Sequence, residues 1–288
     1  MRYNFVFQRA SKSKLLYIDR ANIILEEYAE KGYRLTLRQL YYQLVARDMI
    51  PNRVQEYSKL SREMVFGRMN GLVDWEHIED RLRRPWIPYW YDGVVDAIED
   101  TIKSYRLDRQ EGQDNYLEIW TEKDAVSNIL KKVSSFYHMR LVVNRGYSSC
   151  SAMYDAYNRF GRHDSKSMIL YVGDYDPSGL DMIRDVRERL ETFGLENFEL
   201  IHTALTRDQI DEYNPPPNPA KITDPRADWY ILNHGKDSWE LDALKPEVLE
   251  EIVEGNVKRN IDLPKFLSMS EKEKKDKKLL KKIAKTLL

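Results

Sequence analysis

Residues 167–179 read Ser-Met-Ile-Leu-Tyr-Val-Gly-Asp-Tyr-Asp-Pro-Ser-Gly, a short apolar run followed at once by two aspartates. Such a run, bounded by a glycine, predicts a buried β-strand. A second apolar segment, residues 116–121, precedes Glu122 in the same way. If the two strands are parallel neighbours, Glu122, Asp174 and Asp176 meet at the carboxyl edge of one sheet, where open α/β sheets place their ligands.

Three carboxylates at one edge repel one another unless a cation lies among them. Carboxylate oxygens are hard ligands that suit Mg²⁺. The sequence therefore predicts a Mg²⁺ site held by Glu122, Asp174 and Asp176.

Two other interpretations of the second run stay open. The spacing from Asp174 to Gly179 matches the start of an EF-hand calcium loop, with Asp185 at the twelfth position. Such a loop needs a preceding helix and a final glutamate, and the run before Asp174 is short and apolar. An aspartate nucleophile of a phosphatase also follows a strand, but that interpretation leaves Glu122 without a role.

The pattern from residue 116 onward alternates between strands and helices. It predicts a mainly parallel sheet with helices on its faces, in a domain of the α/β class over residues 109–270. The expected strands are 116–121, 139–143, 167–173 and 198–202, and the expected helices are 124–136, 149–160 and 179–193. A polar stretch containing Gly112 predicts a linker over residues 106–115.

The N-terminal part has a different pattern. Helices are expected over 14–32, over 37–47 after a Thr36 cap, and over 54–67, with a β-ribbon over 71–78. Three helices and a ribbon predict a winged-helix or helix-turn-helix domain over residues 1–108. The end of the chain, residues 271–288, is expected to form a separate Lys-rich helix.

Composition limits the class of protein. The net charge of −1 hides an uneven distribution, because residues 1–47 carry +5 and residues 256–288 carry +7, which leaves −13 in between. Basic ends would suit a polyanion partner, although uneven charge is also common without one. A single cysteine, Cys150, excludes an internal disulfide and fits a reducing compartment. No apolar run is long enough to cross a membrane, so we expect a cytoplasmic, DNA-associated protein.

Five stretches carry a resemblance to a known family. They are WTEKDAVSNIL (120–130), VVNRGYSS (142–149), LYVGDYDPSGLDMI (170–183), the segment 204–226 that contains NPPPNP, and WELDAL (239–244). The first and third resemble the Toprim fold, the metal-binding domain of topoisomerases, primases and some nucleases. Together the five resemble the A subunit of topoisomerase VI and the related meiotic protein that makes double-strand breaks. The chain is shorter than a full A subunit, so a small stand-alone member is the nearest likeness.

The resemblance implies a set of site residues. Glu122, Asp174 and Asp176 correspond to the Mg²⁺ ligands of the Toprim fold, and Lys123 would contact phosphate oxygens. Glu240 and Asp242 are candidates for auxiliary acids, although the start of a surface helix explains them equally well.

The same family places a nucleophilic tyrosine in an Arg-x-x-Tyr-Tyr setting of the N-terminal domain, here Arg38 to Tyr42. The apolar positions of this helix share one face with Tyr41, which predicts a core position for Tyr41. Tyr42 is predicted to be exposed, one turn after Arg38, whose guanidinium would bind phosphate and favour the phenolate. An ordinary surface tyrosine is the alternative. Gln39 departs from the family, which usually has an acidic residue there.

The implied activity is Mg²⁺-dependent DNA strand cleavage of the type IIB topoisomerase kind, giving a 5′-phosphotyrosyl link. The implied partners are double-stranded DNA, a second copy in a homodimer with shared active sites, and a separate ATPase subunit for strand passage. Phosphate contacts are expected from six arginines: Arg53, Arg62, Arg68, Arg81, Arg83 and Arg84. Two alternatives stay open, namely a Toprim nuclease that uses water as the nucleophile and a non-catalytic DNA-binding subunit.

Overall fold

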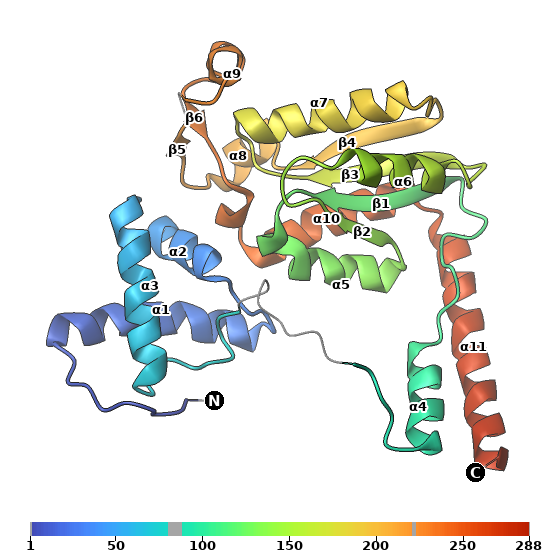
Figure 1. Ribbon diagram of the computed structural model, residues 1–288, viewed down its shortest axis with the longest axis horizontal. Coiled ribbons are helices and arrows are strands. Elements are labelled where there is room, and N and C mark those ends of the chain that lie inside the picture. The colour runs from blue at the N-terminus through green and yellow to red at the C-terminus, as the bar shows by residue number, and fades with distance from the viewer. Residues whose placement is uncertain (1, 80–87, 221–222, 288) are drawn as a thin grey trace.

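The computed structural model describes residues 2–79, 88–220 and 223–287 (Figure 1). Its centre is a four-stranded parallel sheet, which confirms the predicted α/β class. The strands are β1 (Asn115–Thr121), β2 (Arg140–Val143), β3 (Lys166–Val172) and β4 (Phe198–Ala204), in the order β2-β1-β3-β4. From β1 the chain first adds β2 on one side and then crosses back to add β3 on the other side, so the strand order reverses between β1 and β3. Such a reversal opens a crevice at the carboxyl ends of the two strands.

The register places the two acidic runs side by side. Thr121, the last residue of β1, pairs with Val172, the last residue of β3. Glu122 and Gly173 therefore follow at equivalent positions on neighbouring strands, as the sequence predicted.

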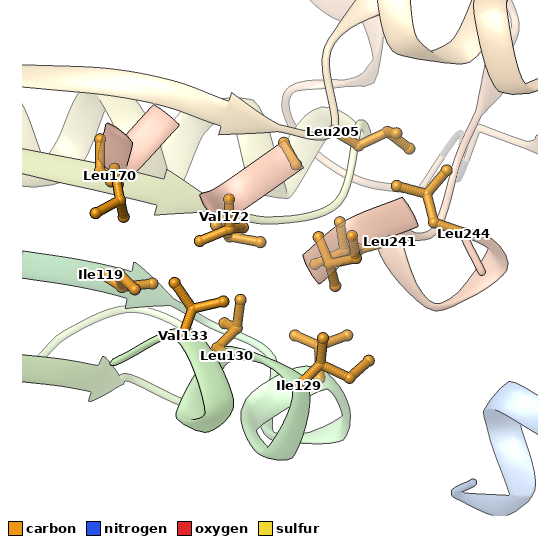
Figure 2. Packing of buried hydrophobic residues seen from close by; sticks show 14 of the residues in the cluster. Ile119, Ile129, Leu130, Val133, Leu170, Val172, Leu205, Leu241 and Leu244 are labelled. Atoms are coloured by element: carbon orange, nitrogen blue, oxygen red, sulfur yellow. The ribbon is translucent and has the colours of Figure 1, made fainter. Parts of the chain in front are cut away.

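Helices cover both faces of the sheet (Figure 1). Alternate residues of β1 point to opposite faces, as the pleat of a strand requires. Leu117 and Ile119 belong to one core with α5 (Ser127–Tyr137) and α10 (Pro246–Asn260). Tyr116 and Trp120 belong to the other, with α6 (Cys150–Phe160) and α7 (Pro177–Thr192). Figure 2 shows the first of these cores closing over the strand ends.

The N-terminal helices form a core of their own. They are α1 (Lys12–Glu30), α2 (Leu37–Ala46) and α3 (Val54–Met69), close to the predicted ranges. Thr36 caps α2 as expected, and Gln39 completes a capping box with it. The predicted β-ribbon over 71–78 is wrong, because the described residues there form only single-residue bridges, such as Leu35 with Ile78. The backbone instead turns at Gly71 and bonds to Gly67 of α3 and to Leu35.

Two further helices lie side by side away from the N-terminal core (Figure 1). They are α4 (Val94–Ser104) and α11 (Leu263–Leu287). The Tyr105 hydroxyl, just after α4, donates to Asp276 of α11. The Lys-rich helix thus begins at Leu263 rather than at residue 271. The helix α4 packs against it, although α4 lies within the range 1–108 that we predicted for the N-terminal domain.

The segment between β4 and α10 builds one wall of the crevice. It contains α8 (Arg207–Tyr213), the paired strands β5 (Asn218–Pro219) and β6 (Asp237–Ser238), α9 (Ala227–His234) and the 3₁₀ helix η2 (Leu241–Ala243). Leu241 and Leu244 enter the sheet core (Figure 2), whereas Ala243 belongs to the N-terminal core. This segment therefore joins the two cores. None of the helices in the described residues is long and apolar enough to cross a membrane.

Candidate functional site

Glu122 lies against the end of β3, as the sequence predicted. Its Oε1 accepts a hydrogen bond of 2.9 Å from the backbone nitrogen of Asp174. The carboxylate fills the space beside Gly173, where a Cβ atom would come within 2.5 Å of Glu122 Oε2. Glycine at position 173 is thus what allows the carboxylate of one strand to reach the end of the next.

Lys123 brings three carboxylates together. Its Nζ lies 2.5 Å from Asp174 Oδ1, 2.5 Å from Glu240 Oε2 and 3.2 Å from Asp242 Oδ1. The backbone nitrogen of Leu241 donates a further bond of 2.7 Å to Asp174 Oδ1. The ammonium is therefore occupied by carboxylates, whereas we expected it to be open to phosphate.

Arg38 joins this cluster from the N-terminal helices. Its Nη2 is ion-paired with Glu240, and its Nε lies 3.3 Å from Asp242 Oδ2. Asp242 is only 1% exposed, so the interpretation of Glu240 and Asp242 as a surface helix start is wrong. Both residues belong to the same charged cluster as Asp174 because η2 turns their side chains inward between the two cores.

Burial and mutual attraction shift the ionisation of this cluster. Burial raises the pKa of Asp174 well above its usual value, against the attraction of Lys123. Burial likewise raises the pKa of Glu122. Burial would also raise the pKa of Glu240, but Lys123 and Arg38 outweigh it and hold that pKa at about 2. Burial thus favours the neutral form of Asp174 and Glu122, whereas its two cationic neighbours favour the ionised form of Glu240.

Asp176 caps a helix at the edge of the site. Its Oδ1 accepts a bond of 2.7 Å from the backbone nitrogen of Gly179 and so caps α7. The neighbouring Ser178 hydroxyl donates to Asp224, which itself pairs with Arg226. The proline at the first position of α7 and this cap explain why the helix begins directly after the acidic run.

Tyr42 is buried, so the prediction of an exposed side chain is wrong. It is 4% exposed, since the β5 segment covers it and Asn218 Nδ2 donates a bond of 2.9 Å to its hydroxyl. The Arg38 guanidinium lies 5.9 Å from the centre of its ring. Burial and the Glu240 charge raise the pKa of Tyr42, although Asn218 and Arg38 oppose them. Tyr41 is buried as predicted, and its hydroxyl contacts Asn52.

A cavity of about 270 Å³ separates the N-terminal helices from the start of α7 and the β5–β6 wall. Polar groups from three parts of the chain line it: Arg38 and Tyr42 of α2, Asp176 and Ser178 at α7, and Asn218, Asp224 and Glu240. The candidate nucleophile and one predicted metal ligand thus face the same space within one chain.

The predicted DNA-contacting arginines have different surroundings. Arg53, just before α3, and Arg62 on α3 are exposed, and the first turn of α3 borders the cavity through Val54 and Tyr57. Arg68 is only partly exposed and donates to the backbone oxygens of Trp75 and Ile78, so its guanidinium holds the chain after α3. Arg81, Arg83 and Arg84 lie outside the described residues.

We next asked whether these residues suit a divalent ion. Within residues 2–79, 88–220 and 223–287, no three acidic, histidine or cysteine side chains are arranged to hold a metal ion directly. The chemistry still fits, because Glu122 Oε2 is buried without a well-formed hydrogen bond, although the Tyr171 hydroxyl interacts with the same carboxylate. The Lys123 ammonium lies against the carboxylates of Asp174, Glu240 and Asp242. Carboxylate oxygens of this kind are also suitable ligands for a hard divalent cation.

Sequence reasoning missed Asn52, Asn218 and Asp224, which position the residues around the cavity. Asn52 Nδ2 donates to Asn218 Oδ1 at 2.9 Å and so links the N-terminal helices to β5. Asparagine and aspartate beside prolines at 215–219 and 223–226 indicate turns, and nothing in that pattern points to a site. Compared with protein-family models and with curated proteins, the chain matches none of them.

Proposed function

We propose that this chain cleaves DNA strands by transesterification, with Tyr42 as the nucleophile and Mg²⁺ held by Glu122, Asp174 and Asp176. The observation that carries the proposal is the common cavity at the junction of the two cores, which Tyr42 and Asp176 both line. When bound there, Mg²⁺ would neutralise charge on the phosphate and on the leaving oxygen.

The chain's own residues would carry the bond exchange. Tyr42 Oη attacks a DNA phosphorus, the bond from phosphorus to the 3′ oxygen breaks, and the phenol proton finally resides on the released 3′ hydroxyl. Asn218 orients the phenol oxygen. Arg38 lies beside the ring and would meet the phosphate once its pairing with Glu240 loosens.

The residues that line the cavity also indicate how many chains are needed to complete the site. The family resemblance implies that the tyrosine of one subunit reaches the acidic site of its partner. Here residues of a single chain line the cavity, which supports a site that one chain can complete. A homodimer would then present two such sites to the two strands of a duplex. A separate ATPase subunit would serve strand passage, a step that cleavage itself does not need.

DNA would approach from the side of α3. Arg53 and Arg62 are exposed there, and the first turn of α3 borders the cavity. Contacts of this kind are made to phosphates and are independent of sequence. We therefore expect salt-sensitive binding with little sequence preference.

One observation favours a second function, hydrolysis of DNA by water. Tyr42 is 4% exposed and its pKa is raised by burial, so the phenol is protonated and covered in this arrangement. A water molecule needs no such exposure. In that case Tyr42 would only pack beneath β5, and the acidic cluster would carry the chemistry.

Cleavage of end-labelled duplex DNA in Mg²⁺, analysed on denaturing gels before and after proteinase digestion, separates these functions. Transesterification predicts protein attached to 5′ ends, abolished by Tyr42→Phe and retained by the matched control Tyr41→Phe. Free 5′ phosphates that survive Tyr42→Phe would establish hydrolysis instead. Binding without any cleavage, by wild type and both variants, would leave only the non-catalytic DNA-binding role.

A further inference from the structure

The charged cluster beyond the ends of β1 and β3 has more negative than positive groups. The Lys123 ammonium and the Arg38 guanidinium pair with the carboxylates of Asp174, Glu240 and Asp242, and a fourth carboxylate, that of Glu122, accepts from the backbone of Asp174. When all six groups are ionised, the cluster carries two more negative than positive charges, and one divalent cation would balance them.

In the part of the chain that the structure describes, Lys123 occupies an oxygen of one predicted metal ligand. Its Nζ lies 2.5 Å from Asp174 Oδ1, on the carboxylate that a cation at Glu122 would need. The side chain is 13% exposed, so water screens the pair poorly. Asp174 cannot turn both oxygens to an ion while one of them accepts from the ammonium and from Leu241.

The Lys123 ammonium also pairs with two carboxylates other than that of Asp174. Glu240 Oε2 lies 2.5 Å from Nζ and Asp242 Oδ1 lies 3.2 Å from it. Both carboxylates follow β6 on a segment that the two cores hold in place. A small rotation of the Lys123 side chain would break its contact with Asp174 while these two pairs remain.

We propose that Lys123 is an internal competitor of the divalent cation, which pairs with Asp174 when no ion is bound and keeps only its pairs with Glu240 and Asp242 when one binds. The inference rests on the metal site of the proposed function and is independent of Tyr42. It assigns Lys123 to the control of ion affinity, and Glu240 and Asp242 to retaining the ammonium once Asp174 is released.

The first test is a titration with Mn²⁺ alone, without DNA, followed by the electron paramagnetic resonance of the free ion. Lys123→Met should bind Mn²⁺ at least tenfold more tightly than the wild type, because a competing charge is removed. Lys103→Met, at an exposed lysine that pairs with Glu99 on its own helix, is the matched control and should leave the affinity unchanged. Adding Asp174→Asn to Lys123→Met should abolish the gain.

Because Lys123→Met leaves buried carboxylates without a cation and is at risk of misfolding, a second test uses the wild type. Acetylation of lysines, followed by peptide mass spectrometry, should be faster at Lys123 with Mg²⁺ than without it, and unchanged at Lys103. The inference is overturned if the wild type binds Mn²⁺ while Lys123→Met binds equally or more weakly, or if Mg²⁺ slows acetylation. Mn²⁺ binding by none of the proteins would overturn the metal site itself together with the inference.

Discussion

Asn218 donates a hydrogen bond of 2.9 Å to the hydroxyl of Tyr42, joining residues 176 positions apart in the chain. The same side chain accepts a bond from Asn52, so one asparagine of β5 fixes two groups of the N-terminal helices. The docking of these helices on the sheet therefore determines what Tyr42 can reach.

Asn218→Ala should lower the free energy of unfolding by about 1–3 kcal/mol, because the buried Tyr42 hydroxyl loses its donor and the exposed Asn52 amide loses one of two acceptors. Urea unfolding measures this. In a Tyr42→Phe background the same substitution should cost less, since one of its bonds is already gone. Asn233→Ala, on the exposed side of α9, is the control and should change stability by less than about 0.5 kcal/mol. Equal costs in both backgrounds would contradict a coupling of Asn218 to Tyr42.

Gly173→Ala tests the placement of Glu122. The new Cβ would lie 2.5 Å from Glu122 Oε2, so the carboxylate must leave the end of β3. We expect a loss of about 1–3 kcal/mol in stability, together with at least tenfold weaker binding of Mn²⁺ in a titration. Gly255→Ala, in α10 with no atom within 4 Å of the added carbon, is the matched control. It should be neutral or stabilise the helix by up to about 1 kcal/mol, with unchanged ion binding.

The strands were predictable because each is one buried apolar run. The predicted segment 116–121 compares with β1 at Asn115–Thr121, and 167–173 compares with β3 at Lys166–Val172. The parallel pairing then brought Glu122 to Asp174, since equal positions on neighbouring strands meet at one edge.

The surroundings of Tyr42 were not predictable in the same way. Helical periodicity separates one face of α2 from another, but it cannot show that a distant segment covers the second face. Asn218 of β5 contacts the Tyr42 hydroxyl, and Glu240 acts on it through its charge, although both are remote in the sequence. The pairing of Lys123 with Glu240, 117 positions away, could not be predicted from the sequence for the same reason.

Arg159→Met tests a second buried charge that the sequence did not reveal. Glu118, fully buried on β1, accepts bonds of 2.6 and 2.8 Å from Arg159 and further bonds from Tyr116 and Trp120. Removing the guanidinium leaves a buried carboxylate without its cation, which should cost about 3–5 kcal/mol in unfolding free energy.

The matched control for Arg159→Met is Lys166→Met, which breaks an exposed pair with Glu199 and should cost less than about 1 kcal/mol. Binding of Mn²⁺ by folded Arg159→Met should equal that of the wild type, because Glu118 points to the α6–α7 side of the sheet. Weaker ion binding would show that this network extends to the candidate site.

His202→Phe should make the protein less sensitive to acid. His202 of β4 has a buried Nε2 with no hydrogen-bond partner among the described residues, and its ring lies parallel to that of Tyr175. Burial lowers the pKa of His202 to about 4. Between pH 6.5 and 4 the unfolded chain therefore binds a proton that the folded chain does not, so stability falls as the pH falls through that window, by ~3 kcal/mol in total. Urea unfolding of wild type and variant at pH 7, 5.5 and 4 measures the difference. Parallel profiles would mean that His202 is protonated in the folded protein, which its buried and unpaired nitrogen does not allow.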